Sequence, residues 1–455
     1  MNYLRKSKGI TLIAIVIIIV LVLVLAGGAI YAINSSLLSK NTYKNNLNKQ
    51  LTIQVSSNII DNQSINNNST QFSLKANEDM GFDYNSLLNA DGSIAFEDAN
   101  FEKGIKLQLQ ITTNEIFPKD VETITDLNVS GGDIKSLNGI QYFKELKSLT
   151  LDRAHLTNIE PLKYLANLET LELNDNGIVD ISPLSGLKAL TSLCLGNNLI
   201  KDITPLGQLV NIRYLNLSGN RITDISVINN ISDSLAFPIF LDNPIMDYSP
   251  IINNFDKIFN NSGFNQNIAE YYINMYNDYQ TAIEKIKDVY KNIITDNMND
   301  LQREYAIVNY LLGQVVYDGD LITTAQPSPD SGATFGYYYF DHPDIYYTFI
   351  LGKGICDAYS ISFLYLATMA NLDSYYYADN LLVHAWNIVK INGNYYQLDL
   401  TWADQTPYNY SFINISSKTM TNLHSSVART SYDAYKYPAT DIDMPVEMQQ
   451  MYYEL

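Results

Sequence analysis

Hydrophobic residues in the first half of the chain recur at a fixed interval of 22 residues. Five leucines mark the period, and isoleucines and prolines repeat in step with it: Leu127, Leu149, Leu171, Leu193 and Leu215, then Ile159, Ile181, Ile203 and Ile225, and Pro161, Pro183 and Pro205. Each unit contains one short strand and a return turn, which cannot enclose a core alone. The pattern therefore predicts a solenoid whose stacked units share one parallel sheet.

An asparagine repeats in step with the leucines. Asn176, Asn198 and Asn220 follow the second leucine of their units by three residues, where a side-chain amide can bond the turning backbone of adjacent coils. Gly132 and Ala154 interrupt this series towards the N-terminus. The residues between the paired leucines should lie on the concave face, which predicts a protein-binding row of Thr150, Glu172, Cys194 and Asn216.

Alternating apolar residues flank Asn392-Gly393 in the second half of the chain. This dipeptide favours a type I′ turn, because both central residues need φ > 0, and it predicts an antiparallel hairpin. With a two-residue loop, the numbers of opposed residues sum to 785 (392 + 393). His384 and Asp399 then lie on one face as diagonal neighbours. A carboxylate beside an imidazole fixes its tautomer and stabilises the imidazolium, as a general base requires.

The same register assigns places to the residues around this pair. Trp386 is expected opposite Asp399, where it would shield the pair from water, and His384 is expected opposite Thr401. Leu400 and Trp402 are expected on the other face of the hairpin, in the core.

Three apolar segments of the second half predict helices over 269–294, 300–316 and 356–371. The last is apolar almost throughout, which indicates a buried helix, and it begins at Cys356. A thiol at a helix N-terminus ionises more readily, whereas the neighbouring carboxylate of Asp357 opposes ionisation. Cys356 is therefore the candidate nucleophile, and its reactivity depends on the approach of His384.

The N-terminus has a different character. Arg5, Lys6 and Lys8 precede an uncharged run over 10–33, long enough to cross a bilayer of roughly 30 Å. The positive charges place the N-terminus in the cytoplasm and the rest of the chain outside the cell membrane. A removable secretory signal is the rival interpretation. The Asn-, Ser- and Gln-rich stretch over 34–93 is expected to be a polar linker.

Composition and motif spacing exclude some classes of partner and cofactor. The 455 residues carry a net charge of −19 and have a pI near 4.5, which argues against nucleic acid as partner. Two cysteines do not make a disulfide framework. Neither metal-ligand spacing nor a Gly-rich phosphate loop occurs in the sequence, so we expect no cofactor and no metal.

The repeats resemble leucine-rich repeats of the bacterial internalin type, in units such as "LELNDNGIVDISPLSGLKAL", and "IAFEDANFEKGIKLQL" resembles that family's cap. The resemblance implies an α/β-type horseshoe that binds a protein.

The segment "KGITLIAIVIIIV" resembles a type IV prepilin leader, which implies cleavage after Gly9. That family usually has Glu five residues after the cut, and this chain has Ala14, so we favour a membrane anchor over a minor pilus component.

Residues 270–410 resemble the transglutaminase-like superfamily in three motifs, "GICDAY", "HAWN" and "DLTW". The order and the intervals of 28 and 15 residues between the Cys, His and Asp also suit that family. The resemblance implies a papain-like α+β fold with Cys356 as nucleophile, His384 as base and Asp399 as orienting acid. His342, in "DHPD", is a second candidate for the base.

These interpretations predict a multidomain chain with an anchor (1–33), a linker (34–93), capped repeats (94–252) and a transglutaminase-like domain (253–455). The first functional hypothesis is an extracytoplasmic, membrane-anchored cysteine acyltransferase or peptidase that acts on a protein or peptide, with repeats that bind a protein. The alternative is a surface binding or adhesion protein whose transglutaminase-like domain is inactive. In both, the repeats themselves are either a binding surface or a spacer.

Overall fold

The computed structural model describes residues 83–262, 266–321, 344–379, 384–404 and 408–423, and positions 440, 442–445, 448 and 450. One compact unit, Thr70–Asp318 with Asp341–Leu455, contains nearly all of them. The predicted anchor (1–33), most of the predicted linker (34–93) and His342 lie outside the described residues.

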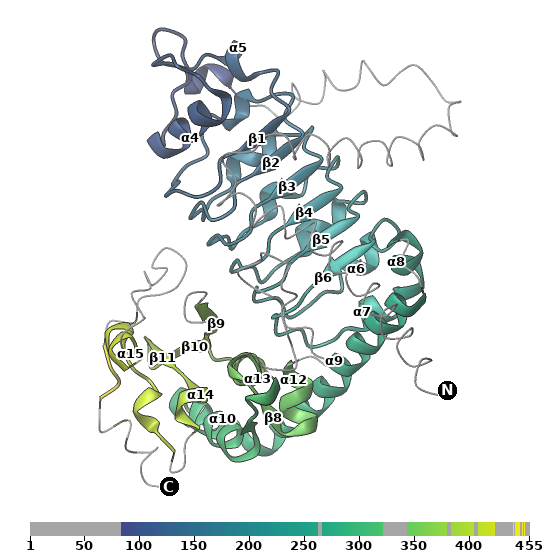
Figure 1. Ribbon diagram of the computed structural model, residues 1–455, viewed down its shortest axis with the longest axis vertical. Coiled ribbons are helices and arrows are strands. Elements are labelled where there is room, and N and C mark those ends of the chain that lie inside the picture. Colours follow the sequence, from purple (N-terminus) through teal and green to yellow (C-terminus); the bar gives the residue numbers. More distant parts are fainter. Residues whose placement is uncertain are drawn as a thin grey trace, which may run out of the picture. The chain divides into compact units, whose positions relative to one another are not determined.

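The 22-residue units form one parallel sheet in which the strands follow chain order (Figure 1). The strands are β1 (Asp126–Asn128), β2 (Ser148–Thr150), β3 (Thr170–Glu172), β4 (Ser192–Cys194), β5 (Tyr214–Asn216) and β6 (Phe237–Ile239). The central leucines pair in register, as in Leu149 with Leu171 and Leu193 with Leu215, and they are buried. The predicted solenoid is confirmed, and we call residues 126–252 the repeat array.

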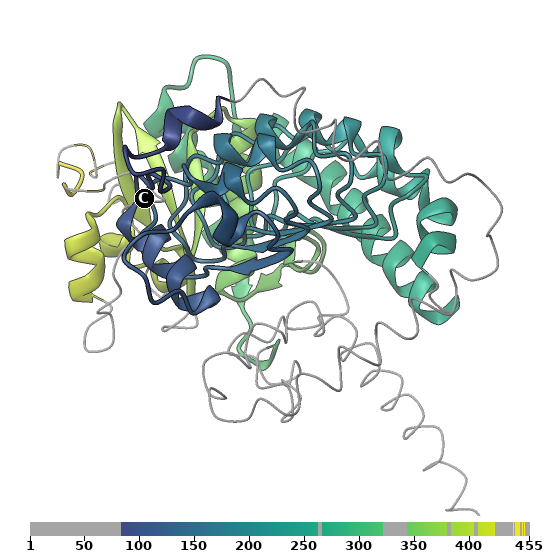
Figure 2. The same ribbon diagram turned by 90° about the horizontal axis from the view of Figure 1, so that it is seen from above.

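Each coil returns through a short helical turn, and Figure 2 shows these turns along one side of the sheet. Three of these turns have a proline near their start, at Pro161, Pro183 and Pro205. Proline lacks a backbone N–H, and at the start of a helix that N–H would have no partner within the helix. The turns are η3 (Ile140–Tyr142), η4 (Glu160–Tyr164), η5 (Ser182–Leu184), η6 (Thr204–Gln208), α6 (Ile228–Ile231) and α7 (Ser249–Ile252).

The repeated asparagines hold one coil to the next. The Asn198 side-chain amide donates to the carbonyls of Leu173, at 2.9 Å, and Leu195, at 3.0 Å. Its Oδ1 accepts from the Ile178 amide at 3.0 Å. Asn198 is 2% exposed, so these bonds satisfy backbone groups that water cannot reach.

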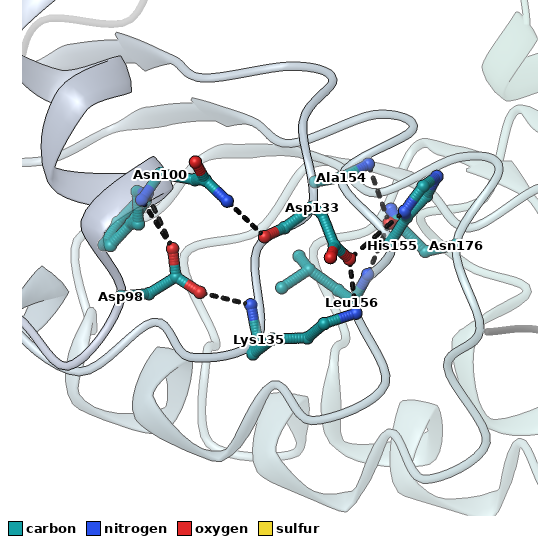
Figure 3. Close-up of polar contacts among 9 residues, drawn as sticks. Asp98, Asn100, Asp133, Lys135, Ala154, His155, Leu156 and Asn176 are labelled. Carbon is teal, nitrogen blue, oxygen red and sulfur yellow. Dashed lines mark hydrogen bonds and ion pairs between the residues drawn. The ribbon is translucent and has the colours of Figure 1, made fainter.

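The N-terminal end of the repeat array is covered by η2 (Tyr84–Leu87), α4 (Ala99–Leu109) and α5 (Pro118–Val121). Asp98 caps α4, since its Oδ1 accepts from the amides of Asn100 and Phe101, and its Oδ2 accepts from the Lys135 amide at 2.6 Å (Figure 3). One buried carboxylate thus fixes the helix to the first coil.

Ala154 interrupts the asparagine series, and the next coil supplies the hydrogen-bond acceptor for its backbone amide. Asn176 Oδ1 accepts from the amides of Ala154 and Leu156, at 3.0 and 2.9 Å (Figure 3). The amides of Ala154 and Leu156 are therefore bonded although their coil has no asparagine of its own at this position.

The C-terminal region, residues 253–455, mixes helices with two small sheets. Its elements are α8 (Phe255–Ser262), α9 (Gln266–Ile293), α10 (Asp300–Gln314), β7 (Val316–Tyr317), α12 (Asp344–Tyr346), η7 (Tyr347–Leu351), β8 (Lys353–Gly354), α13 (Cys356–Met369), β9 (Ser374–Asp379), β10 (His384–Ile391), β11 (Asn394–Leu398), α14 (Leu400–Ala403), η8 (Tyr410–Phe412) and α15 (Ser417–Leu423). The three predicted helices correspond to α9, α10 and α13. The second ends at Gln314, earlier than predicted, because Val316 and Tyr317 pair with β8.

The predicted hairpin is present and has the predicted register. Asn387 opposes Leu398 and Ile391 opposes Asn394, so both pairs sum to 785. Asn392 and Gly393 have φ of 50° and 89°, as a type I′ turn requires. The sequence did not predict that β9 adds a third strand on the far side of β10, which makes the sheet order β11-β10-β9 and buries the hairpin strand next to α13.

Among the described residues, no helix combines the length and apolar character needed to span a bilayer. The predicted anchor falls outside that part of the chain.

Replacing Asn198 by Ala should destabilise the repeat array by about 2–4 kcal/mol, because the Ile178 amide and several buried carbonyls lose their partner. The matched control is Asn211→Ala, since Asn211 makes a similar bond to the Lys188 carbonyl at an exposed position. Its cost should stay below about 1 kcal/mol. Urea unfolding measures the free energy of unfolding of both variants. Equal destabilisation by the two substitutions would refute the role of the buried asparagines in holding the coils together.

Candidate active site

His384 and Asp399 form a close pair. The His384 Nε2 lies 2.7 Å from Asp399 Oδ2, and the Asp399 side chain is fully buried. The other carboxylate oxygen accepts from the Trp402 amide at 3.1 Å, and the Asp399 amide donates to the Phe412 carbonyl at 3.0 Å. A buried carboxylate fixed by these contacts holds the imidazole in one orientation.

Asp399 reaches His384 by a different route from the one predicted. β11 ends at Leu398, and Asp399 is the N-cap of α14, so it is not a strand residue. His384 is therefore not opposed to Thr401 but pairs in register with Asp379 of β9. Asp and Thr just after a strand favour a cap over continued pairing, because the carboxylate can accept from the helix's free amides.

Cys356 is the first residue of α13 and lies beside the His384 strand. The backbone amide of Ala385 interacts with its sulfur and favours the thiolate. Burial, and next to it the charge of Asp357, raise the pKa of the Cys356 thiol above its usual range. The structure thus brings Cys356 to the segment that carries His384, in surroundings that keep the free thiol protonated.

Asp357 stands between the thiol and β9. Its Oδ2 is 3.9 Å from the Cys356 sulfur, and its Oδ1 accepts from the Tyr376 hydroxyl at 2.5 Å. Burial raises the Asp357 pKa, whereas the Tyr376 bond and the charge of His384 lower it. The Asp357 carboxyl therefore interacts electrostatically with both members of the proposed Cys–His pair.

Two tryptophans flank His384. Trp386 is 5% exposed, its ring centroid is 5.7 Å from that of His384, and its Nε1 donates to Gln397 Oε1 at 2.8 Å. It opposes Tyr377 of β9, not Asp399 as predicted, because β11 stops short. The prediction that Trp402 is a core residue is wrong: its side chain is 39% exposed and its centroid is 6.3 Å from that of His384. Helix α14 turns Trp402 outward where a strand would have turned it inward.

Two motif residues have structural roles that sequence reasoning missed. The buried Asn387 donates its Nδ2 to the Ser360 carbonyl at 2.9 Å, which ties β10 to α13. The Tyr359 hydroxyl donates to the Val315 carbonyl at 3.2 Å and to Asp404. Polar residues inside apolar segments were the available signal, since a buried polar group needs a partner.

The predicted concave row is aligned across the repeat array. Thr150, Glu172, Cys194 and Asn216 are successive partners in the sheet. Thr150 Oγ1 donates to Glu172 Oε2 at 3.3 Å, and burial raises the pKa of the Glu172 carboxyl. Burial, with Glu172 and Asp152, raises the pKa of Cys194, which is 8% exposed. The binding role of this row stays a prediction.

Asp152 adds a buried carboxyl next to that row. It is 3% exposed, and its Oδ1 accepts from the Asn174 amide at 2.6 Å. Burial raises its pKa to about 7. No cluster of His, Cys, Asp and Glu that could hold a metal occurs among the described residues.

Asp152→Asn should stabilise the protein at pH 8 but not at pH 4. The folded-state pKa lies above the unfolded value, so the folded state holds an extra proton between about pH 4 and 7 and loses stability as the pH rises through that window. Asn keeps the acceptor for Asn174 without a charge. We expect a gain of the order of 1–3 kcal/mol at pH 8, measured by urea unfolding. Asp180→Asn, at an exposed carboxylate that accepts from Ser182, should leave the pH dependence unchanged.

Asp357→Asn should lower the apparent pKa of the Cys356 thiol, because it removes the nearest negative charge while keeping an acceptor for Tyr376. The rate of Cys356 alkylation at pH 7 should rise by about threefold or more. Asp404→Asn is the control, since Asp404 binds the same helix through Tyr359 and is not among the groups that act on the sulfur. Equal rates in both variants would contradict this prediction.

A family model described as "Leucine Rich repeats (2 copies)" matches residues 166–208 and 190–235. Among curated proteins no match is found. Solved structures similar to the chain include an internalin (inlF) of Listeria monocytogenes, 34% identical, which covers 35% of this chain and 48% of its own length with a TM-score of 0.34. The chain thus spans about half of that internalin.

An internalin C2 (inlC2) of the same organism is 27% identical, covers 35% of this chain and 90% of its own length, and gives a TM-score of 0.25. A leucine-rich-repeat protein of Leptospira interrogans is 22% identical over 34% of this chain and 42% of its own, with a TM-score of 0.28. The coils within residues 166–235 are leucine-rich repeats, followed in the chain by an α+β region.

Proposed function

We propose that the protein is a membrane-anchored, extracytoplasmic cysteine acyltransferase or peptidase of the transglutaminase-like class, which acts on protein substrates. The observation that carries the proposal is the contact of 2.7 Å between His384 and the fully buried Asp399, next to a cysteine at the start of α13. Nucleophile, base and orienting acid in this arrangement are the parts that acyl transfer requires.

The chemistry follows from these three side chains. The Cys356 thiolate attacks a carboxamide or peptide carbonyl, His384 gives its proton to the departing ammonia or amine, and a thioester remains. An amine or a water molecule then resolves the thioester and frees the thiol, with His384 taking the proton. Amine resolution cross-links two proteins, and water gives deamidation or proteolysis. Trp386 and Trp402 flank the imidazole and would exclude bulk water from the reacting atoms.

The high pKa of the free thiol is compatible with this chemistry. Burial and Asp357 disfavour an isolated thiolate. An imidazolium held by Asp399 offsets that cost once the proton has moved from sulfur to His384, since the products form an ion pair. The same high pKa is the observation that favours the second candidate, a surface binding protein with an inactive C-terminal region.

The repeats would supply the protein-binding part in either case. The aligned row from Thr150 to Asn216 offers a concave surface, and repeat arrays commonly use such surfaces for binding. A surface location and the membrane anchor over 1–33 belong to the same proposal. Detection of an intact Met1 on the mature protein would exclude the alternative of a pilus component cleaved after Gly9.

An amine-incorporation assay tests the proposal. Wild type and Cys194→Ala should couple a fluorescent primary amine to casein, Cys356→Ala should not, and Asp399→Asn should be slower by about 100-fold or more, because the imidazole loses its orienting carboxylate. Ammonia release without incorporation would indicate hydrolysis. If the wild type does neither, and Cys356 is alkylated like an ordinary thiol, the binding-protein alternative holds.

A further inference from the structure

Exposed apolar side chains of the described residues gather around the Cys356 site. Ten large apolar residues of that part of the chain are exposed, and the other four are scattered over α4, the repeat array and the end of the C-terminal region. Six belong to segments next to the site, and we call them the apolar patch: Val316, Tyr317, Ile350, Leu351, Trp402 and Tyr408. Single exposed apolar residues are ordinary, whereas a group of them indicates a binding surface.

The part of the patch on β7 and η7 is held together by the short parallel sheet. Val316 and Tyr317 pair with β8, and the Val316 amide donates to the Gly352 carbonyl at 3.0 Å. Helix η7, whose last residue is Leu351, ends directly before Gly352. Cys356 follows β8 after one residue, and burial, and next to it the charge of Cys356, raise the pKa of the Tyr317 hydroxyl. This part of the patch therefore lies beside the thiol.

The part of the patch on and after α14, Trp402 and Tyr408, is joined to the same place. The Tyr359 hydroxyl, one turn after Cys356 in α13, donates to the backbone carbonyl directly before β7 at 3.2 Å and to Asp404, directly after α14. The Tyr408 hydroxyl donates to a carbonyl in the last turn of α10 at 2.8 Å. Both parts of the patch are thus connected through the helix turn that carries the thiol.

The chain segments that carry the patch are followed by acidic residues. Asp318 and Asp320 follow β7, and Asp404 follows α14. Lys353 follows η7, and its ammonium pairs with Asp318 at 3.0 Å. Three carboxylates and one ammonium give these four groups a net charge of −2. A peptide with basic residues complements this surface, whereas an acidic peptide is repelled.

We propose that the apolar patch binds the substrate chain on either side of the target carboxamide, and that it selects large apolar side chains next to that group and basic residues further out. The identity of the bound peptide as a substrate rests on the proposed function, whereas its binding does not require turnover. Burial of apolar side chains supplies the favourable free energy, and the tyrosines and tryptophan of the patch are residue types enriched in binding surfaces.

Peptide binding to the full chain with Cys356→Ala, which prevents turnover, tests the proposal. The first peptide is fluorescein-labelled and has Gln between Leu residues, with Lys at both ends. In the second peptide Ser replaces Leu, and in the third Glu replaces Lys. Fluorescence anisotropy should show that the first binds about tenfold more tightly than the second and about threefold more tightly than the third, because each replacement removes one source of complementarity.

Val316→Thr and Leu351→Gln place polar side chains of similar size in the patch. Each should weaken binding of the Leu peptide by about threefold to tenfold and leave binding of the Ser peptide unchanged. Leu351→Gln serves if the Val316 variant fails to fold, since Leu351 lies outside the sheet. The matched control is Val179→Thr in the repeat array, where the valine is 56% exposed against 67% at Val316, and both affinities should stay unchanged.

Two results overturn the proposal. One is equal affinity for the Leu and Ser peptides, or equal effects of the Val316 and Val179 variants. The other comes from sedimentation: self-association that is lost in the Leu351→Gln variant assigns the patch to a contact between two copies of the chain.

The amine-incorporation assay with the same peptides, on the chain with Cys356 intact, separates this proposal from the proposed function. Selective binding of the Leu peptide by a protein that incorporates no amine and releases no ammonia removes the enzyme proposal and leaves the binding surface. Amine incorporation with equal KM for the Leu and Ser peptides removes the role of the patch alone.

Discussion

The site depends on one fully buried carboxylate, Asp399. An ion without water must have its oxygens satisfied by the protein, and here His384 takes one and the first turn of α14 takes the other. The Asp399 backbone is itself held by Phe412. Because the same side chain ends β11, starts α14 and orients the imidazole, the local fold and the proposed chemistry cannot be separated at this residue.

In the repeat array, buried backbone groups also need hydrogen-bond partners, and the repeated asparagines supply them. Each buried asparagine serves backbone groups of its own coil and of its neighbour, so the array remains satisfied only when the coils are stacked in register. At the N-terminal end Asp98 performs the same task for α4. At the C-terminal end no further coil exists, and the tyrosines of α9 and the sheet beside Arg221 cover the last one.

The acidic residues of the chain differ in their exposure to water. Most carboxylates of the residues that the structure describes are exposed to water, where they favour solubility. Asp152 is instead withdrawn from water, and burial raises its pKa to about 7. Protonation of Asp152 therefore contributes to the pH dependence of the stability of the repeat array.

The sequence alone determined the features that rest on periodicity and turn chemistry. The 22-residue repeat fixed the parallel solenoid and its concave row, and Asn392-Gly393 fixed the hairpin register, since both depend on short-range rules of spacing and φ. The apolar segment after Cys356 likewise predicted α13.

Only the tertiary structure decided which groups from distant segments meet. It ended β11 at Leu398 because a capping Asp competes with strand pairing, which moved Trp402 outward and opposed Trp386 to Tyr377. It also brought Arg221 to Asp373, 152 residues away in sequence, because packing of the repeat array against the C-terminal helices and sheet is a property of whole surfaces that no local pattern encodes.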